Sequence, residues 1–153
     1  MLGVFFMVLV ALANKKMSPL FQKRTHLYYE YDRNKVVLPQ GKTGHEIAKE
    51  NIKELVSDIS LSLKLYPQEE QALLSELQNA SLDIQSSTIR ISFVTQEDLT
   101  RLLPLSFSIS PTNLSRIQFV VSPAKNSSIS APQLRSIRRD GFSVVEIGAY
   151  SAQ

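Results

Sequence analysis

The residues that could carry chemistry gather in one short stretch, from Gly41 to Glu46. A Gly-Lys-Thr sequence that follows an apolar run and precedes a predicted helix has the setting of a phosphate-binding loop. That loop also needs a glycine five positions before Gly41, where Val36 stands. Without that glycine the backbone amides cannot wrap around a phosphate. The sequence therefore favours a glycine-containing turn that leads into a capped helix.

His45 and Glu46 begin a near match to the zinc-protease motif H-E-x-x-H. The second histidine position holds Lys49, and an ammonium group cannot bind zinc. The chain has no cysteine and two histidines, which excludes disulfides and thiol catalysis and leaves few metal ligands. We predict no metal site and no cofactor. An enzymatic alternative stays open, with a site near residues 41–46 formed by Lys42, Thr43, His45 and Glu46.

Two clusters of basic residues indicate an interaction surface rather than a reaction. Three arginines near the C-terminus are spaced so that a helix would bring them to one face: Arg135, Arg138 and Arg139. Four more cations lie within residues 14–26: Lys15, Lys16, Lys23 and Arg24. Cations next to a bilayer attract anionic lipid by about 1 kcal/mol each. We expect these seven residues to contact a protein partner or an anionic lipid surface.

Residues 1–13 form an uncharged, apolar N-terminal segment. As a helix it would be about 20 Å long, against a hydrocarbon core of about 30 Å. Three interpretations remain open: a membrane anchor or interfacial helix, a signal peptide cleaved after Ala13, or a core strand or helix. The nearby positive charge follows the segment, so an anchor would keep the bulk of the chain on the cytoplasmic or equivalent side. A cleaved signal peptide would instead predict a secreted or periplasmic protein.

The remaining chain, residues 27–153, is expected to form a single α+β domain after a basic linker at 14–26. A chain of 153 residues that is 43% hydrophobic and 20% charged fits one domain and excludes a disordered chain. Helical spacing of apolar residues predicts a long helix that begins at a capping box of Thr43 and Glu46. Three further helices are expected over residues 67–79, 95–103 and 130–140.

Alternation of apolar and polar residues predicts strands over 27–31, 35–38, 88–93, 105–110, 116–121 and 142–147. A strand that is buried on both faces has a continuous run of apolar residues, whereas the strands predicted here alternate between apolar and polar residues. We therefore predict a two-layer α+β sandwich, with a mainly antiparallel or mixed sheet and helices on one face. The open face would carry Arg90, Arg116 and Gln118. It would lack an aromatic side chain on which a base could stack, so nucleic acid is not an expected partner.

Together these features favour a non-enzymatic, membrane-associated module for interaction or assembly, as a subunit or accessory protein of a larger membrane complex. The reasons are the apolar N-terminal segment, the basic linker and the incomplete catalytic motifs. One alternative is a secreted or periplasmic binding domain with a cleaved signal peptide. The other is an enzyme with its site near residues 41–46.

Overall fold

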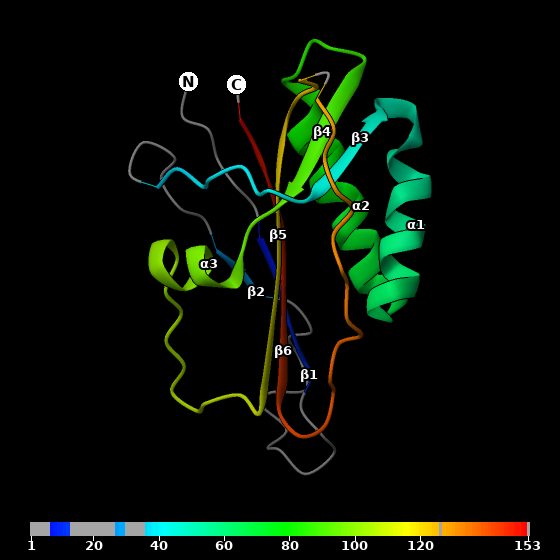
Figure 1. Ribbon diagram of the computed structural model, residues 1–153. Coiled ribbons are helices and arrows are strands. Elements are labelled where there is room, and N and C mark those ends of the chain that lie inside the picture. The colour runs from blue at the N-terminus through cyan, green and yellow to red at the C-terminus, as the bar shows by residue number, and fades with distance from the viewer. Residues whose placement is uncertain (1–6, 13–26, 30–35, 126, 153) are drawn as a thin grey trace.

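The computed structural model of the chain describes residues 7–12, 27–29, 36–125 and 127–152. It has the α+β fold expected from the sequence (Figure 1). The elements follow in the order β1 (Met7–Leu12), β2 (Leu27–Tyr29), β3 (Gly44–Ala48), a short 3-10 helix (Lys49–Asn51), α1 (Ile52–Leu63), α2 (Pro67–Leu82), β4 (Thr88–Phe93), α3 (Gln96–Leu102), β5 (Asn113–Pro123) and β6 (Ser143–Ser151).

A mixed sheet with the strand order β2-β1-β6-β5-β4-β3 runs through the molecule. Strands β5 and β6 are parallel, in a register that extends from Asn113 opposite Ser143 to Val121 opposite Ser151. The other neighbouring strands are antiparallel. This arrangement places β6 and β5 in the interior of the sheet and leaves β3 at one edge.

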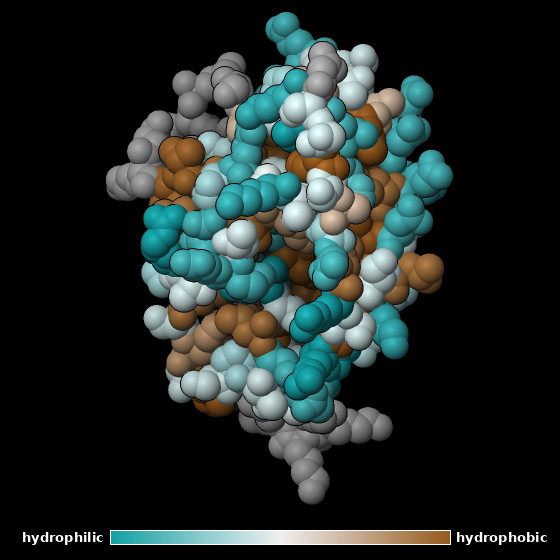
Figure 2. Space-filling view, in the orientation of Figure 1, coloured by the Kyte–Doolittle hydropathy of each residue, from teal (hydrophilic) through white to brown (hydrophobic). Residues whose placement is uncertain are grey.

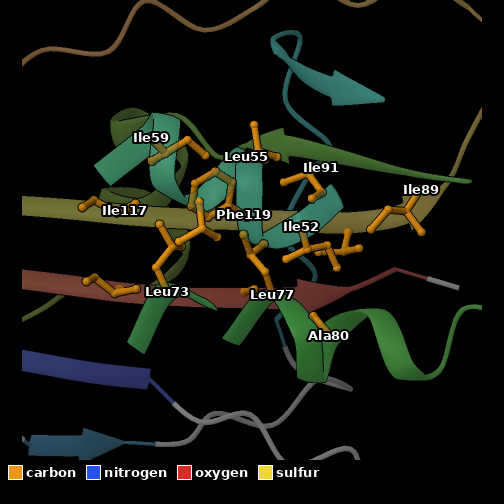
Figure 3. Packing of buried hydrophobic residues seen from close by; sticks show 14 of the residues in the cluster. Ile52, Leu55, Ile59, Leu73, Leu77, Ala80, Ile89, Ile91, Ile117 and Phe119 are labelled. Carbon is orange, nitrogen blue, oxygen red and sulfur yellow. The ribbon is translucent and has the colours of Figure 1, made fainter. Parts of the chain in front are cut away.

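The long helices α1 and α2 cover one face of the sheet, as predicted (Figure 1). Their apolar residues recur every three or four positions and meet the inward-facing side chains of β4, β5 and β6. Figure 3 shows this packing around Phe119, whose ring centroid lies 4.2 Å from that of Phe93. Burial of each large aliphatic side chain contributes about 1.5–3 kcal/mol to folding. The fully buried members include Ile59, Leu73, Leu77, Ile89, Ile91 and Ile147.

The opposite face of the sheet is covered, and the prediction that it would be open is wrong. Helix α3 lies on this side (Figure 1), where Leu99 packs in one cluster with Val120 and Tyr150. Arg116 and Gln118 are buried there, and both donate hydrogen bonds to the carboxylate of a third buried side chain, Glu146. The alternation that predicted a wet face therefore reflects a buried polar network.

The connection from β5 to β6, residues 124–142, is called the crossover below. Because β5 and β6 are parallel, the crossover must return along the eleven residues of β5, a distance of about 36 Å. The predicted helix at 130–140 is wrong, since residues 131–139 form no helix. In a helix Ile137 N–H would donate to the carbonyl four residues earlier, but it donates to the carbonyl of Leu63 instead. Its apolar residues Leu134 and Ile137 pack against the main core.

Three other predicted elements also differ. The pattern Thr43-x-x-Glu46 does not cap a helix, since residues 44–48 form β3 and α1 begins at Ile52. Residues 36–38 and 105–110 form no strand. The second of these segments lies between Pro104 and Pro111, and proline cannot donate a ladder hydrogen bond.

Part of the apolar N-terminal segment belongs to the sheet. Met7–Leu12 form β1, which pairs antiparallel with β6. Within the described residues, no helix is long and apolar enough to cross a bilayer. Residues 1–6, 13 and the basic linker at 14–26 lie outside the described residues.

Candidate functional site

Strand β3 is the edge of the sheet nearest to α1, and its backbone alternates between two directions. Phe93 N–H donates to the carbonyl of Thr43 at 3.0 Å, so Thr43 faces β4. In an antiparallel pair every second residue exchanges hydrogen bonds with the partner strand. His45 and Ile47 therefore also bond to β4, and the backbone groups of Gly44, Glu46 and Ala48 point outward.

The crossover uses only the beginning of this outward edge. Thr43 and Ser130 form an isolated parallel bridge, in which Gly44 N–H donates to the Ser130 carbonyl at 2.9 Å. To extend this pairing, residue 132 would have to donate to the Gly44 carbonyl. Residue 132 is proline and has no N–H, so the pairing stops there. In the part of the chain that the structure describes, the outward N–H groups of Glu46 and Ala48 have no backbone partner.

A groove of about 390 Å³ lies beside this open edge, between β3 and α1. His45 and Ile47 line it from β3, and Pro132 and Leu134 close it from the crossover. The helical wall is formed by Asn51 at the end of the 3-10 helix and by a stripe of α1 with helical spacing, which consists of Glu54, Leu55, Asp58, Ile59 and Ser62. We call this site the β3 groove.

The β3 groove has an apolar floor and an acidic wall. Leu55 and Ile59 are buried at the bottom, while Glu54 and Asp58 are exposed one helical turn apart. The lining of this groove contains no lysine or arginine. Partial burial lowers the pKa of His45, an effect that the nearby carboxylate of Asp58 opposes. The groove therefore carries net negative charge.

The side chains of the predicted site at residues 41–46 do not converge. His45 lines the β3 groove, whereas its neighbour Glu46 projects from the opposite face of the strand. Glu46 accepts hydrogen bonds from Lys125 N–H at 3.0 Å and from Arg90 Nε at 2.8 Å. These two contacts, the first above all, hold the pKa of Glu46 below its ordinary value. Lys42 is exposed.

Gly44 has a packing role in the sheet. A Cβ atom at this position would lie 2.2 Å from the carbonyl oxygen of Ile91, because β3 and β4 approach closely here. Within the described residues, no group of three or more histidine, aspartate or glutamate side chains could hold a metal ion.

Comparisons of this chain with models of known protein families, with curated proteins and with solved structures find no match. The assignment of a site therefore rests on the geometry of the chain itself.

The three C-terminal arginines differ in their surroundings, and they do not share a helical face because residues 131–139 of the crossover form no helix. Arg139 donates to both carboxylate oxygens of Glu69, at 2.9 and 2.6 Å, and its guanidinium lies 4.0 Å from the centre of the Tyr66 ring. It therefore joins the crossover to the start of α2. Arg135 and Arg138 are exposed, and their contact with a partner stays a prediction.

Arg135 and Arg138 line a second groove of about 560 Å³, between the crossover and the beginning of β5. Its apolar lining includes Leu63, Phe93 and Ile117. Figure 2 shows hydrophobic atoms in a hollow on this side of the molecule, surrounded by more hydrophilic side chains. The four predicted interaction residues of the basic linker, Lys15, Lys16, Lys23 and Arg24, lie outside the described residues, and their role stays a prediction.

Sequence reasoning did not find the β3 groove. It requires the strand register, which shows which amides point outward, and the position of the crossover, which brings Pro132 beside Gly44. The only part of the groove that the sequence indicates is its wall on α1, through the helical spacing of Leu55 and Ile59.

Proposed function

We propose that this protein is a non-enzymatic interaction module that binds an extended segment of a partner protein as an added strand on β3. The observation that carries the proposal is the outer edge of β3 beside a groove, where the Glu46 and Ala48 N–H groups have no backbone partner among the described residues. Addition of a strand to an exposed sheet edge is a general mode of peptide recognition, in which backbone hydrogen bonds provide affinity and side-chain pockets provide specificity.

The outer edge of β3 offers both backbone hydrogen-bonding groups and a pocket for side chains. Glu46 and Ala48 present outward N–H groups, and the carbonyls of Gly44 and Glu46 face the same way. Every second side chain of an added strand would point into the β3 groove, since side chains alternate across a strand. The edge is only five residues long, and a short edge limits unspecific pairing between sheets.

The predicted membrane association rests on residues 1–26, most of which lie outside the described residues, and it forms no part of this proposal. A role as a subunit or accessory protein is compatible with strand addition, because the bound segment would belong to another protein of the assembly.

The proposal is tested with Ala48→Pro and its matched control Ala48→Ser. The backbone of Ala48 has φ −66°, ψ 143°, which proline adopts without strain, so the variant should fold while it loses the outward N–H. Peptides selected from a displayed random library on the wild-type protein serve as probes. Loss of one hydrogen bond, about 1 kcal/mol, together with the bulk of the ring should weaken their binding at least about 5-fold.

Ala48→Ser keeps the N–H and should bind the same peptides as tightly as the wild type does. Circular dichroism and thermal unfolding verify that both variants fold. The proposal is overturned if the library yields no binding peptide, or if the selected peptides bind Ala48→Pro and wild type equally.

A further inference from the structure

We infer that the segment bound on β3 is basic, with lysine or arginine at alternate positions whose side chains enter the β3 groove. This inference rests on the proposed strand addition and specifies the chemistry of the partner.

The first argument is charge. The wall of the β3 groove presents the carboxylates of Glu54 and Asp58, and its lining has no basic side chain that would neutralise them. Both residues are exposed, so a bound cation would keep part of its hydration. Such pairs are worth up to about 1 kcal/mol each.

The second argument is spacing. Glu54 and Asp58 are four residues apart in α1, which corresponds to a rise of about 6 Å. Residues i and i+2 of an added strand are about 6.7 Å apart and point to the same face. Two basic residues separated by one position would therefore each approach one carboxylate.

The third argument is the floor of the groove. Lysine and arginine have long aliphatic stems that can lie on apolar surface while the charged end stays in water. Here the stems would cover Ile47, Leu55 and Ile59, and the charged ends would reach the acidic wall above them. An acidic segment would meet repulsion at the same wall.

A second copy of this chain fits the edge less well. If two β3 strands paired about a two-fold axis, both α1 helices would lie on the same face of the joined sheet. Glu54 and Asp58 of the two copies would then face one another with like charge. The crossover cannot fill the site either, since Pro132 ends its pairing with β3.

The test uses three blocked decapeptides, in which threonine alternates with lysine, glutamine or glutamate. Their dissociation constants are measured by fluorescence anisotropy at low and high salt. We expect the lysine peptide to bind about 10-fold more tightly than the glutamine peptide, and the glutamate peptide to bind more weakly than either. The advantage of the lysine peptide should shrink as salt rises.

The double variant Glu54→Gln/Asp58→Asn should reduce the affinity for the lysine peptide to that for the glutamine peptide. Glu97→Gln, which removes an exposed carboxylate on α3, is the matched control and should change nothing. Ala48→Pro should weaken binding of the lysine and glutamine peptides alike.

The outcomes separate the two proposals. If the lysine and glutamine peptides bind equally and Ala48→Pro weakens both, the basic preference is overturned while strand addition stands. If the lysine peptide binds in a way that Ala48→Pro does not affect, strand addition itself is overturned. A dimer in solution that Ala48→Pro dissociates would identify a second copy as the occupant and overturn the inference of a basic partner.

Discussion

Individual ion pairs join distant parts of this chain, and their burial determines what they contribute. Glu69 is fully buried at the start of α2 and is held by Arg139 of the crossover, whose side chain is 15% exposed. Arg139→Gln would leave the Glu69 carboxylate buried without its cation. Since a buried charge that loses its partner costs about 3–5 kcal/mol, we expect a loss of about 3 kcal/mol in the free energy of unfolding.

Arg101→Gln provides the comparison for Arg139→Gln. Arg101 pairs with Asp98 at 2.6 Å, but its side chain is 64% exposed. Solvent screening limits such pairs, so its removal should cost less than about 1 kcal/mol. Urea denaturation of both variants measures the difference, and equal losses would contradict a structural role of the Arg139–Glu69 pair.

Glu76 predicts a dependence of stability on pH. It lies on α2, is buried, and accepts a hydrogen bond from Ala149 N–H of β6. Burial raises its pKa from the ordinary 4.5 to about 7, against the opposing effect of that hydrogen bond. The folded state therefore holds this proton more tightly than the unfolded state does. Its favourable contribution is complete below pH 4.5 and is lost as the pH rises through 7.

Glu76→Gln should remove this dependence, because glutamine carries no charge and can accept the same hydrogen bond. Near pH 4 the variant and the wild type should be similarly stable. At pH 8 the variant should be more stable, by at most about 3 kcal/mol. Urea denaturation between pH 4 and pH 8 provides the measurement, and parallel stability curves for the two proteins would refute the assignment.

At the scale of elements, the end of α1 stores strain that a single substitution can relieve. Lys64 follows the last residue of this helix with φ 56° and ψ 51°, in the left-handed region. For a residue with a Cβ atom this conformation costs about 1 kcal/mol of conformational free energy, whereas for glycine it does not. After the greater flexibility of glycine in the unfolded chain is subtracted, Lys64→Gly should stabilise the protein by about 0.5 kcal/mol.

The control for Lys64→Gly is Ser57→Gly, at an exposed position in the middle of α1. Glycine in a helix interior is less favourable than serine, so this variant should be less stable by about 0.5 kcal/mol. Thermal unfolding measures the change in stability of each variant. A gain for Lys64→Gly together with a loss for the control would confirm that the conformation of Lys64 causes the effect. A loss of stability in both would show that it does not.

Sequence reasoning located the elements whose pattern is set by local packing. The spacing of Ile52, Leu55, Val56 and Ile59 predicted α1, and these residues are buried as expected. Thr95 was expected to cap α3, and its hydroxyl accepts a hydrogen bond from Asp98 N–H. The α+β class followed from such elements, because each has one apolar face that another element must cover.

The elements that were missed depend on long-range geometry. Residues 44–48 pair with β4, and Glu46 pairs with Arg90, which lies 44 residues away. The pattern of Thr43 and Glu46 resembles a helix cap, but these long-range contacts accompany a strand instead. Ile137 N–H donates to the carbonyl of Leu63, which is distant in sequence, so Leu134 and Ile137 pack from a non-helical crossover despite their helical spacing. The β3 groove depends on both of these arrangements, and the local pattern could not reveal it.

At the scale of the whole molecule, the strand order predicts where backbone amides exchange with solvent. Strands β5 and β6 pair along nine residues, so the amides that donate across this pair should exchange only through global unfolding. Along β3 the protection should alternate. His45 and Ile47 bond to β4 and should exchange slowly, whereas Glu46 and Ala48 face outward and should exchange quickly.

Native-state hydrogen exchange resolved by residue tests this alternation, and it bears directly on the proposed site. Fast exchange at Glu46 and Ala48 means that the outer edge of β3 is available to a partner strand. Addition of a peptide that binds there should slow exchange at these two amides and leave those of β5 unchanged, because only outward groups gain partners. If all amides of β3 were slow in the free protein, the edge would already be paired and strand addition on β3 would be excluded.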